Sequence, residues 1–211
     1  LSPQIHGENP EQDSPQYLSI KDKLTFIKGD VCFRADWLKA LEGVDAVVHL
    51  AAETGTGQSM YAIEKYNLVN SQGTAILCDI LVNEKHQIKK LVLGSTRAVY
   101  GEGSYMNKEG NLVYPKSRKA SDMKAGKFDL FDENGEELKA VPTTEEAKLL
   151  PSSIYAISKL YQEQLIQTTC ESLDLNYTIL RFQNVYGAGQ SIKNPYTGIL
   201  SIFSTQMLEN K

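Results

Sequence analysis

A tyrosine and a lysine stand four residues apart in a segment with helical character. Tyr155 and Lys159 lie between Ser153 and Ser172, where the sequence predicts a helix. Residues four apart share one helical face, so the lysine ammonium can favour the phenolate and lower the tyrosine pKa from about 10. A tyrosine tuned in this way can act as a general base or acid. Taken alone, the pair is more typical of the surface of an amphipathic helix than of a catalytic site.

Two hydroxyl residues precede this pair by about sixty positions. Ser95 and Thr96 stand where a buried strand predicted from Lys90 to Ser95 ends. In α/β folds the active site lies at the carboxyl ends of parallel strands, so a hydroxyl here can hydrogen-bond a substrate. The segment 49–57 also follows a predicted strand and is rich in small residues, which let a cofactor lie against the backbone.

Strands and helices alternate along the chain, and this alternation must position those residues. Such a pattern requires parallel strands joined by crossover helices, which predicts a doubly wound α/β fold with a Rossmann-like parallel sheet. We expect a loop at the polar start of the chain. The predicted strands are Leu24–Lys28, Val44–Leu50, Lys90–Ser95 and Tyr177–Phe182, and the predicted helices are Arg34–Leu41, Met60–Asn83, Ser153–Ser172 and Gly198–Leu208.

One polar stretch, residues 102–150, breaks the alternation. Within it, Asn134 and Gly135 stand between two apolar runs, which predicts a hairpin with a type I′ turn. We interpret this stretch as a surface insertion. Residues 1–211 then form one partial domain of the Rossmann-like type.

Composition excludes several other kinds of protein. The 211 residues are 41% hydrophobic and carry a net charge of −4, which argues against a nucleic-acid partner. The three cysteines, Cys32, Cys78 and Cys170, lack CxxC spacing, so no disulfide framework and no metal site are predicted. No apolar run approaches the ~20 residues that span a bilayer. We therefore expect a cytoplasmic protein without a membrane partner.

Several segments, in this order, resemble the extended short-chain dehydrogenase/reductase family of NAD-dependent nucleotide-sugar epimerases and dehydratases. They are Gly29-Asp-Val31, the HLAA sequence at 49–52, NSQGT at 70–74, the segment 95–101, YAISK at 155–159 and RFQNVYG at 181–187. The resemblance covers almost the whole chain. Segments 57–61, 101–105 and 194–203 resemble the subgroup of dTDP-L-rhamnose 4-epimerase-like proteins.

The resemblance implies a role for each matching residue. Catalysis would fall to Tyr155, Lys159 and Thr96. The cofactor NAD would be bound by Asp30, Val31, Leu50, Ala51, Ala52, Asn70, Tyr155 and Lys159. The nucleotide-sugar substrate would be bound by Ser95, Thr96, Asn184 and Asn194.

The residues after Thr96 bear on which reaction the resemblance implies. The family's 4,6-dehydratases place an aspartate and a glutamate there, whereas this chain has Arg97 and Ala98, which cannot transfer protons near neutral pH. We therefore expect epimerisation of a dTDP- or UDP-hexose at carbon 4 through a keto intermediate, by a homodimer. Two alternatives share the same residues: another oxidoreductase of the family (a dehydratase or reductase), and a binding protein without catalysis.

The family binds the cofactor pyrophosphate first through a glycine-rich GxxGxxG turn, and this sequence contains no such turn. We therefore expect the first strand, the glycine-rich helix start and the second strand of the family to be missing, together with its C-terminal substrate lobe. The 211 residues alone are then expected to be inactive.

Overall fold

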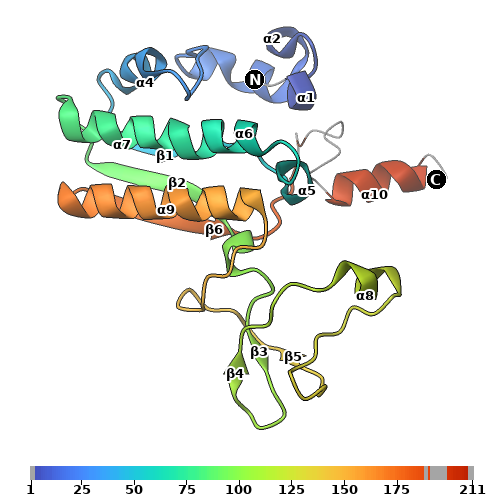
Figure 1. Cartoon of the computed structure of the whole chain (residues 1–211). Helices are drawn as coiled ribbons and strands as arrows, with labels where there is room; N and C mark the ends of the chain where they lie inside the picture. Colours follow the sequence, from blue (N-terminus) through green and yellow to red (C-terminus); the bar gives the residue numbers. More distant parts are fainter. Residues whose placement is uncertain (1–2, 188–189, 191–198, 209–211) are drawn as a thin grey trace.

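A three-stranded parallel sheet forms the centre of the fold (Figure 1). The computed structural model describes residues 3–187, 190 and 199–208. The strands lie in the order β1-β2-β6, with β2 in the middle and paired in parallel with both neighbours. Their bounds are Ala46–His49 for β1, Lys90–Thr96 for β2 and Asn176–Phe182 for β6. The predicted strands after residue 43 are thus confirmed, the first of them at reduced length.

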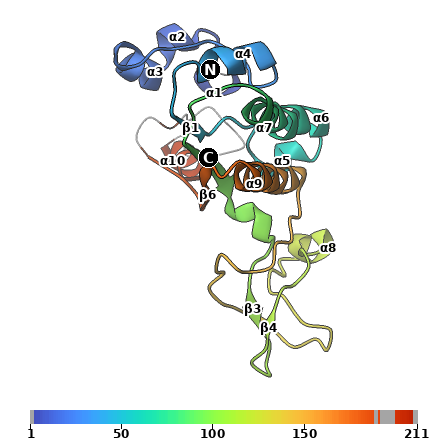
Figure 2. The same ribbon diagram turned by 90° about the vertical axis from the view of Figure 1, so that its left-hand side faces the viewer.

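Two long helices, α7 (Gly73–Asn83) and α9 (Ile154–Ser172), lie on the same face of this sheet (Figure 2). Ser153 begins α9 as its N-cap, since its side chain accepts a hydrogen bond from the backbone of Ala156. Helix α4 (Arg34–Leu41) packs against α7. Apolar side chains from these elements form the main core: Trp37, Val47, Leu77, Cys78, Ile80, Leu81, Ile88, Leu91, Leu93, Ile166 and Cys170. The predicted parallel sheet with crossover helices is confirmed.

The helix predicted from Met60 to Asn83 is divided into three consecutive parts. Helix α6 (Ile63–Tyr66) continues into a π-helical turn, η2 (Asn67–Gln72), and then into α7, while α5 (Thr56–Ser59) stands apart. Gly73, the first residue of α7, lies close to the loop that carries Val31, because a Cβ at this position would lie 2.9 Å from the Val31 side chain. This glycine therefore lets the 29–32 loop pack directly on the helix.

The prediction for residues 3–28 is wrong. Instead of a loop, this part forms helices α1 (Pro3–His6), α2 (Pro10–Asp13), α3 (Pro15–Ile20) and η1 (Lys21–Lys23). Proline suits the first helical position because its fixed φ is helical and its missing N–H is not needed there. The strand predicted at Leu24–Lys28 is not formed, since no described strand pairs with it and Leu24 and Phe26 are exposed.

The insertion extends away from the main sheet, below it in Figure 1. It follows η3 (Arg97–Tyr100) and contains an antiparallel sheet of β3 (Tyr105–Met106), β4 (Leu112–Val113) and β5 (Lys139–Ala140), together with α8 (Ala120–Lys124).

The predicted hairpin in the insertion is present as a single bridge between Phe131 and Glu137, but its turn type was predicted wrongly. A type I′ turn needs positive φ at both central residues. Only Gly135, at 80°, has it, while Asn134 does not. The backbone N–H of Gly135 donates to the carbonyl of Asp132 and closes a type I turn over residues 132–135. Gly135, with its positive φ, then forms a glycine bulge, so the loop is one residue longer than a type I′ turn allows.

Candidate active site

The carboxyl ends of the three parallel strands meet at one edge of the sheet, toward α5 in Figure 1. Leu50–Ala52 follow β1, Thr96 ends the central strand β2, and Asn184 follows β6. Because β2 lies between β1 and β6, Thr96 stands in the middle of this edge. The first turn of α9 lies over the same edge (Figure 1). The topology therefore brings together predicted residues that are up to 134 positions apart, from Leu50 to Asn184.

Tyr155 and Thr96 meet at this edge. Burial raises the pKa of the half-buried Tyr155 phenol above its usual value, while a hydrogen bond with the Thr96 side chain lowers it. Thr96 is itself nearly buried, and its hydroxyl accepts a hydrogen bond from Ala98 N at 3.2 Å, which holds it at the start of η3. A phenol and a hydroxyl in contact, with the phenol still partly exposed, can exchange a proton with a bound hydroxyl group.

Lys159 does not act on Tyr155 in the way that the spacing predicted. Its ammonium donates a hydrogen bond to Gln162 Oε1 at 2.5 Å, and burial of the side chain lowers the pKa of Lys159 to about 8, although the Glu163 carboxylate raises it. The predicted lowering of the Tyr155 pKa by Lys159 is therefore corrected: burial dominates and raises it. An i,i+4 spacing fixes the shared helical face, but the rotamer of a long side chain depends on its tertiary partners.

Tyr66 is a site residue that the sequence analysis missed. It is fully buried, and its ring packs edge-on against the ring of Tyr155 with centroids 6.3 Å apart. Its hydroxyl donates to the backbone carbonyls of Thr54 and Gly55, the latter at 2.9 Å. One aromatic side chain thus supports both the candidate catalytic phenol and the loop after β1.

Asn70 and Ser95 have their side-chain groups engaged inside the protein. The fully buried Asn70 accepts from Glu53 N at 2.8 Å and donates to Glu53 O and to Ser158 Oγ. Ser95 donates to the Glu163 carboxylate, because neighbouring residues of a strand face opposite sides of the sheet and Ser95 faces α9. These hydrogen bonds hold the loop at Glu53 and helix α9 in place. The cofactor contact of Asn70 and the substrate contact of Ser95 that the resemblance implied stay predictions.

The loop that carries Asp30 and Val31 is fixed by α4. Asp36 accepts a hydrogen bond from Asp30 N at 2.8 Å, and the Trp37 indole donates to Val31 O at 2.8 Å. The Asp30 carboxylate accepts from Cys32 N but is exposed, and Leu50 and Ala51 after β1 are exposed as well. These groups are accessible to a ligand at the sheet edge.

A second group that the sequence analysis missed is the ion pair between Arg181 and Glu163. Arg181 Nη2 lies 2.8 Å from Glu163 Oε2, and its Nη1 donates to the Tyr100 hydroxyl at 2.7 Å. Glu163 is only 3% exposed, so this carboxylate depends on its partners for its charge. The pair joins α9, β6 and η3 directly beneath the site.

A sequence signal for these residues does exist. On α9, polar residues occupy the positions i, i+3, i+4, i+7 and i+8 that normally carry the apolar face of a helix. These positions are Tyr155, Ser158, Lys159, Gln162 and Glu163. A polar stripe at core spacing indicates that a helix buries functional or hydrogen-bonded groups.

The remaining predicted substrate residues are Asn184 and Asn194. Asn184 is exposed directly after β6, and Asn194 lies outside the described residues. In the part of the chain that the structure describes, no helix has the length and apolar character needed to cross a membrane. Among the same residues, no group of three or more histidine, cysteine, aspartate or glutamate side chains could hold a metal ion.

Comparison with known proteins decides the family. The sequence pattern of the NAD dependent epimerase/dehydratase family matches residues 4–122 and 131–211. The chain belongs to this family. Within it, dTDP-L-rhamnose 4-epimerase of Burkholderia thailandensis is 34% identical over the whole of this chain. The resemblance drawn from the sequence segments is therefore confirmed.

Solved structures of epimerases share the fold. UDP-N-acetylglucosamine 4-epimerase of Methanobrevibacter ruminantium, in complex with UDP-N-acetylmuramic acid, is 28% identical over 90% of this chain with a TM-score of 0.65. UDP-glucuronic acid 4-epimerase of Bacillus cereus, with UDP-glucuronic acid and NAD, is 25% identical over 93% with a TM-score of 0.66. The chain spans 56% of the Burkholderia protein and 49% of each of these two structures.

Proposed function

We propose that this chain forms the catalytic part of an enzyme that epimerises a nucleotide sugar at carbon 4, with NAD as cofactor and a dTDP- or UDP-hexose as substrate. The observation that carries the proposal is the contact between Tyr155 and Thr96 at the carboxyl edge of the sheet, with Lys159 one turn further along α9. Family membership and the three 4-epimerases described above support it.

The accessible groups around the site fit the adenosine end of NAD. The exposed Asp30 carboxylate can accept hydrogen bonds from hydroxyl or amino groups, and Val31 offers an apolar contact beside it. Ala51 and Ala52 are small enough for a ligand to approach the backbone after β1. Asn70 holds this loop from below through Glu53. We assign residues 1–211 to one cofactor-binding domain with the surface insertion at about 102–150.

In this proposal Tyr155 takes the proton of the carbon 4 hydroxyl and later returns it. Thr96 holds the same hydroxyl through a hydrogen bond, and Asn184 lies at the edge where the diphosphate of the substrate would bind. Because burial raises the Tyr155 pKa, its ionisation needs positive charge nearby, and in this proposal the Lys159 ammonium, one turn further along α9, takes that role once the cofactor is bound. Bound NAD would accept hydride from carbon 4 and give it back to the opposite face of the keto-sugar.

Product analysis distinguishes epimerisation from the alternatives. The whole enzyme of which this chain is a part, given dTDP- or UDP-hexoses with NAD, is expected to interconvert carbon 4 epimers. It is expected to release no 4-keto-6-deoxy sugar, since Arg97 and Ala98 cannot transfer protons near neutral pH. The keto product is measured by its ultraviolet absorbance in alkali. Its appearance would establish a dehydratase, and net formation of NADH would establish a dehydrogenase that releases its product.

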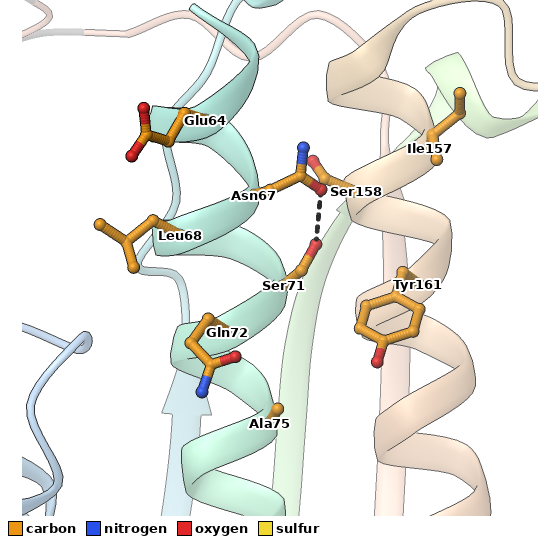
Figure 3. A pocket seen from close by; sticks show the side chains of 9 residues that line it. All are labelled: Glu64, Asn67, Leu68, Ser71, Gln72, Ala75, Ile157, Ser158 and Tyr161. Atoms are coloured by element: carbon orange, nitrogen blue, oxygen red, sulfur yellow. Dashed lines mark hydrogen bonds between the residues drawn. The ribbon is translucent and has the colours of Figure 1, made fainter.

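The proposed enzyme acts as a homodimer in the cytoplasm. An open groove of about 640 Å³ lies between the α6-η2-α7 run and α9 (Figure 3). Ile157, Tyr161 and Leu68 line it and are 49%, 45% and 49% exposed. Ala75 and polar side chains complete the lining: Glu64, Asn67, Ser71, Gln72 and Ser158. Exposed apolar side chains within a polar surround favour a protein partner, and we take that partner to be a second copy of the chain. The three cysteines are free, which fits a reducing compartment.

Replacing Tyr161 with glutamate tests the dimer. The added charge would have to be buried in the interface without a partner of opposite charge, so the variant is expected to run as a monomer while its far-ultraviolet circular dichroism stays unchanged. Light scattering coupled to size-exclusion chromatography measures the mass. Gln164→Glu is the matched control, because Gln164 is exposed on the same helix and does not line the groove. A Tyr161→Glu variant that keeps the wild-type dimer mass would refute this interface.

A further inference from the structure

A buried chain of hydrogen bonds runs from Lys159 into the centre of the fold. The Lys159 ammonium donates to Gln162 Oε1 at 2.5 Å, and Gln162 Nε2 donates to Thr74 Oγ1, also at 2.5 Å. Gln162 and Thr74 are 0% exposed and Lys159 only 2%. This series of hydrogen bonds therefore joins α9 to α7 through side chains that are shielded from bulk solvent.

The direction of every bond in this chain is determined. The Thr74 hydroxyl donates to the backbone carbonyl of Asn70 at 2.7 Å, so its oxygen can only accept from other groups. His49 Nε2 lies 2.9 Å from the same oxygen and 3.4 Å from Gln162 Nε2, and its tautomer decides with which of the two it forms a hydrogen bond. Burial and the charge of Lys159 lower the pKa of His49 to about 4, which keeps the ring neutral. Gln162 must then present its amide nitrogen to Thr74 and its oxygen to Lys159.

We propose that Gln162 is a positioning residue for the Lys159 ammonium, and that Thr74 sets the orientation in which its amide does so. The inference rests on the proposed function only in taking Lys159 as part of the catalytic site. A neutral carbonyl anchors the ammonium without cancelling its charge, whereas a carboxylate in the same place would neutralise it. The positive charge thus remains available on the ammonium, one helical turn from Tyr155 on α9.

Among the described residues, Lys159 interacts electrostatically with Glu163 on α9 and with His49 on β1, whose ring is neutral. Tyr155 is the other titratable group on the same face of α9. Glu163 raises the pKa of Lys159, but its carboxylate is shared with Arg181 of β6. Gln162 is uncharged and contacts the ammonium directly. Replacing its side chain therefore changes the electrostatic potential at Lys159, while Glu163 and His49 are expected to keep their positions.

Two substitutions at Gln162 test the proposal. Gln162→Glu keeps the shape and the acceptor but adds a charge, so it is expected to raise the pKa of Lys159 by ~1–3 units. Gln162→Met keeps the length but removes the acceptor, so it is expected to lower that pKa below the wild-type value of about 8. The pKa is measured by following the ¹³Cε resonance of Lys159 with pH in the protein without substrate, assigned by its loss in Lys159→Arg.

The pH profile of kcat is expected to move in the same direction in each variant, with KM for the sugar nucleotide nearly unchanged. Gln164→Met is the matched control, since Gln164 is exposed on the same helix, and it should leave the Lys159 titration in place. If Gln162→Met fails to fold, Gln162→Glu carries the test alone.

An unchanged Lys159 pKa in a folded Gln162→Glu variant would overturn the proposal. Because the titration needs neither cofactor nor sugar, it separates the two hypotheses. A shifted pKa in a protein without 4-epimerase activity would refute the proposed function and leave the positioning role intact.

Discussion

Tyr155→Phe in the whole enzyme of which this chain is a part is expected to lower kcat by ~100-fold or more, because it removes the proton-transfer group and keeps the aromatic ring. The ring packs against Tyr66, and phenylalanine preserves that contact, so the loop after β1 and the binding of NAD should change little. The loss should therefore appear in kcat, with KM for the sugar nucleotide close to wild type. Steady-state kinetics of carbon 4 epimerisation, together with calorimetric titration of NAD, measure both quantities.

Tyr161→Phe provides the matched control for this experiment. Tyr161 lies on the same helix, but it lines the groove between α9 and the α6-η2-α7 run and is 45% exposed. Losing its hydroxyl should therefore leave kcat within a few-fold of wild type. Activity of Tyr155→Phe comparable to that of this control would remove Tyr155 from the mechanism. The proton would then have to pass through another group, of which Thr96 lies nearest in the described site.

Arg181→Met is expected to reduce the free energy of unfolding by about 3 kcal/mol, because it leaves the Glu163 carboxylate buried without its ionic partner. Ser95 still donates to this carboxylate and the Lys159 charge lies nearby, which places the loss at the lower end of the usual range for a broken buried pair. Arg181 also holds Tyr100 and the Glu145 carbonyl, so the entry and exit of the insertion should loosen. Urea unfolding at pH 7 measures the loss.

The interpretation of that loss is checked by two further variants. Glu163→Gln combined with Arg181→Met should recover part of the stability, because it removes the unpaired charge. Lys108→Met breaks an exposed pair with Glu136, whose side chains are 69% and 50% exposed, and should cost less than about 1 kcal/mol. A loss for Arg181→Met no larger than that for Lys108→Met would show that Glu163 does not depend on the pair.

Local patterns in the sequence were sufficient for the central sheet. β2 and β6 each contain a short run of mostly apolar residues that follows a polar residue, and α9 begins at a serine cap, so their existence and approximate bounds were predictable. The start of the chain was not predictable in this way. Leu24–Lys28 has the composition of a strand, but a strand forms only with a hydrogen-bonded neighbour, and the sequence of one segment does not contain that information.

For the candidate site, the sequence alone determined which residue types stand at the strand ends and that Tyr155 and Lys159 share a helical face. It could not determine what each side chain contacts. Tertiary packing turned Lys159 toward Gln162 and Ser95 toward Glu163, while it left Thr96 in contact with Tyr155.

The physical reason is that a buried polar group must find partners, and those partners come from elements far apart in the chain. Gln162 donates to Thr74, which lies 88 residues earlier in the sequence, and Arg181 donates to Tyr100, which lies 81 residues earlier. Residue spacing determines the helical face on which a side chain lies. Only the packed fold decides which hydrogen bond that side chain makes, and hence its charge.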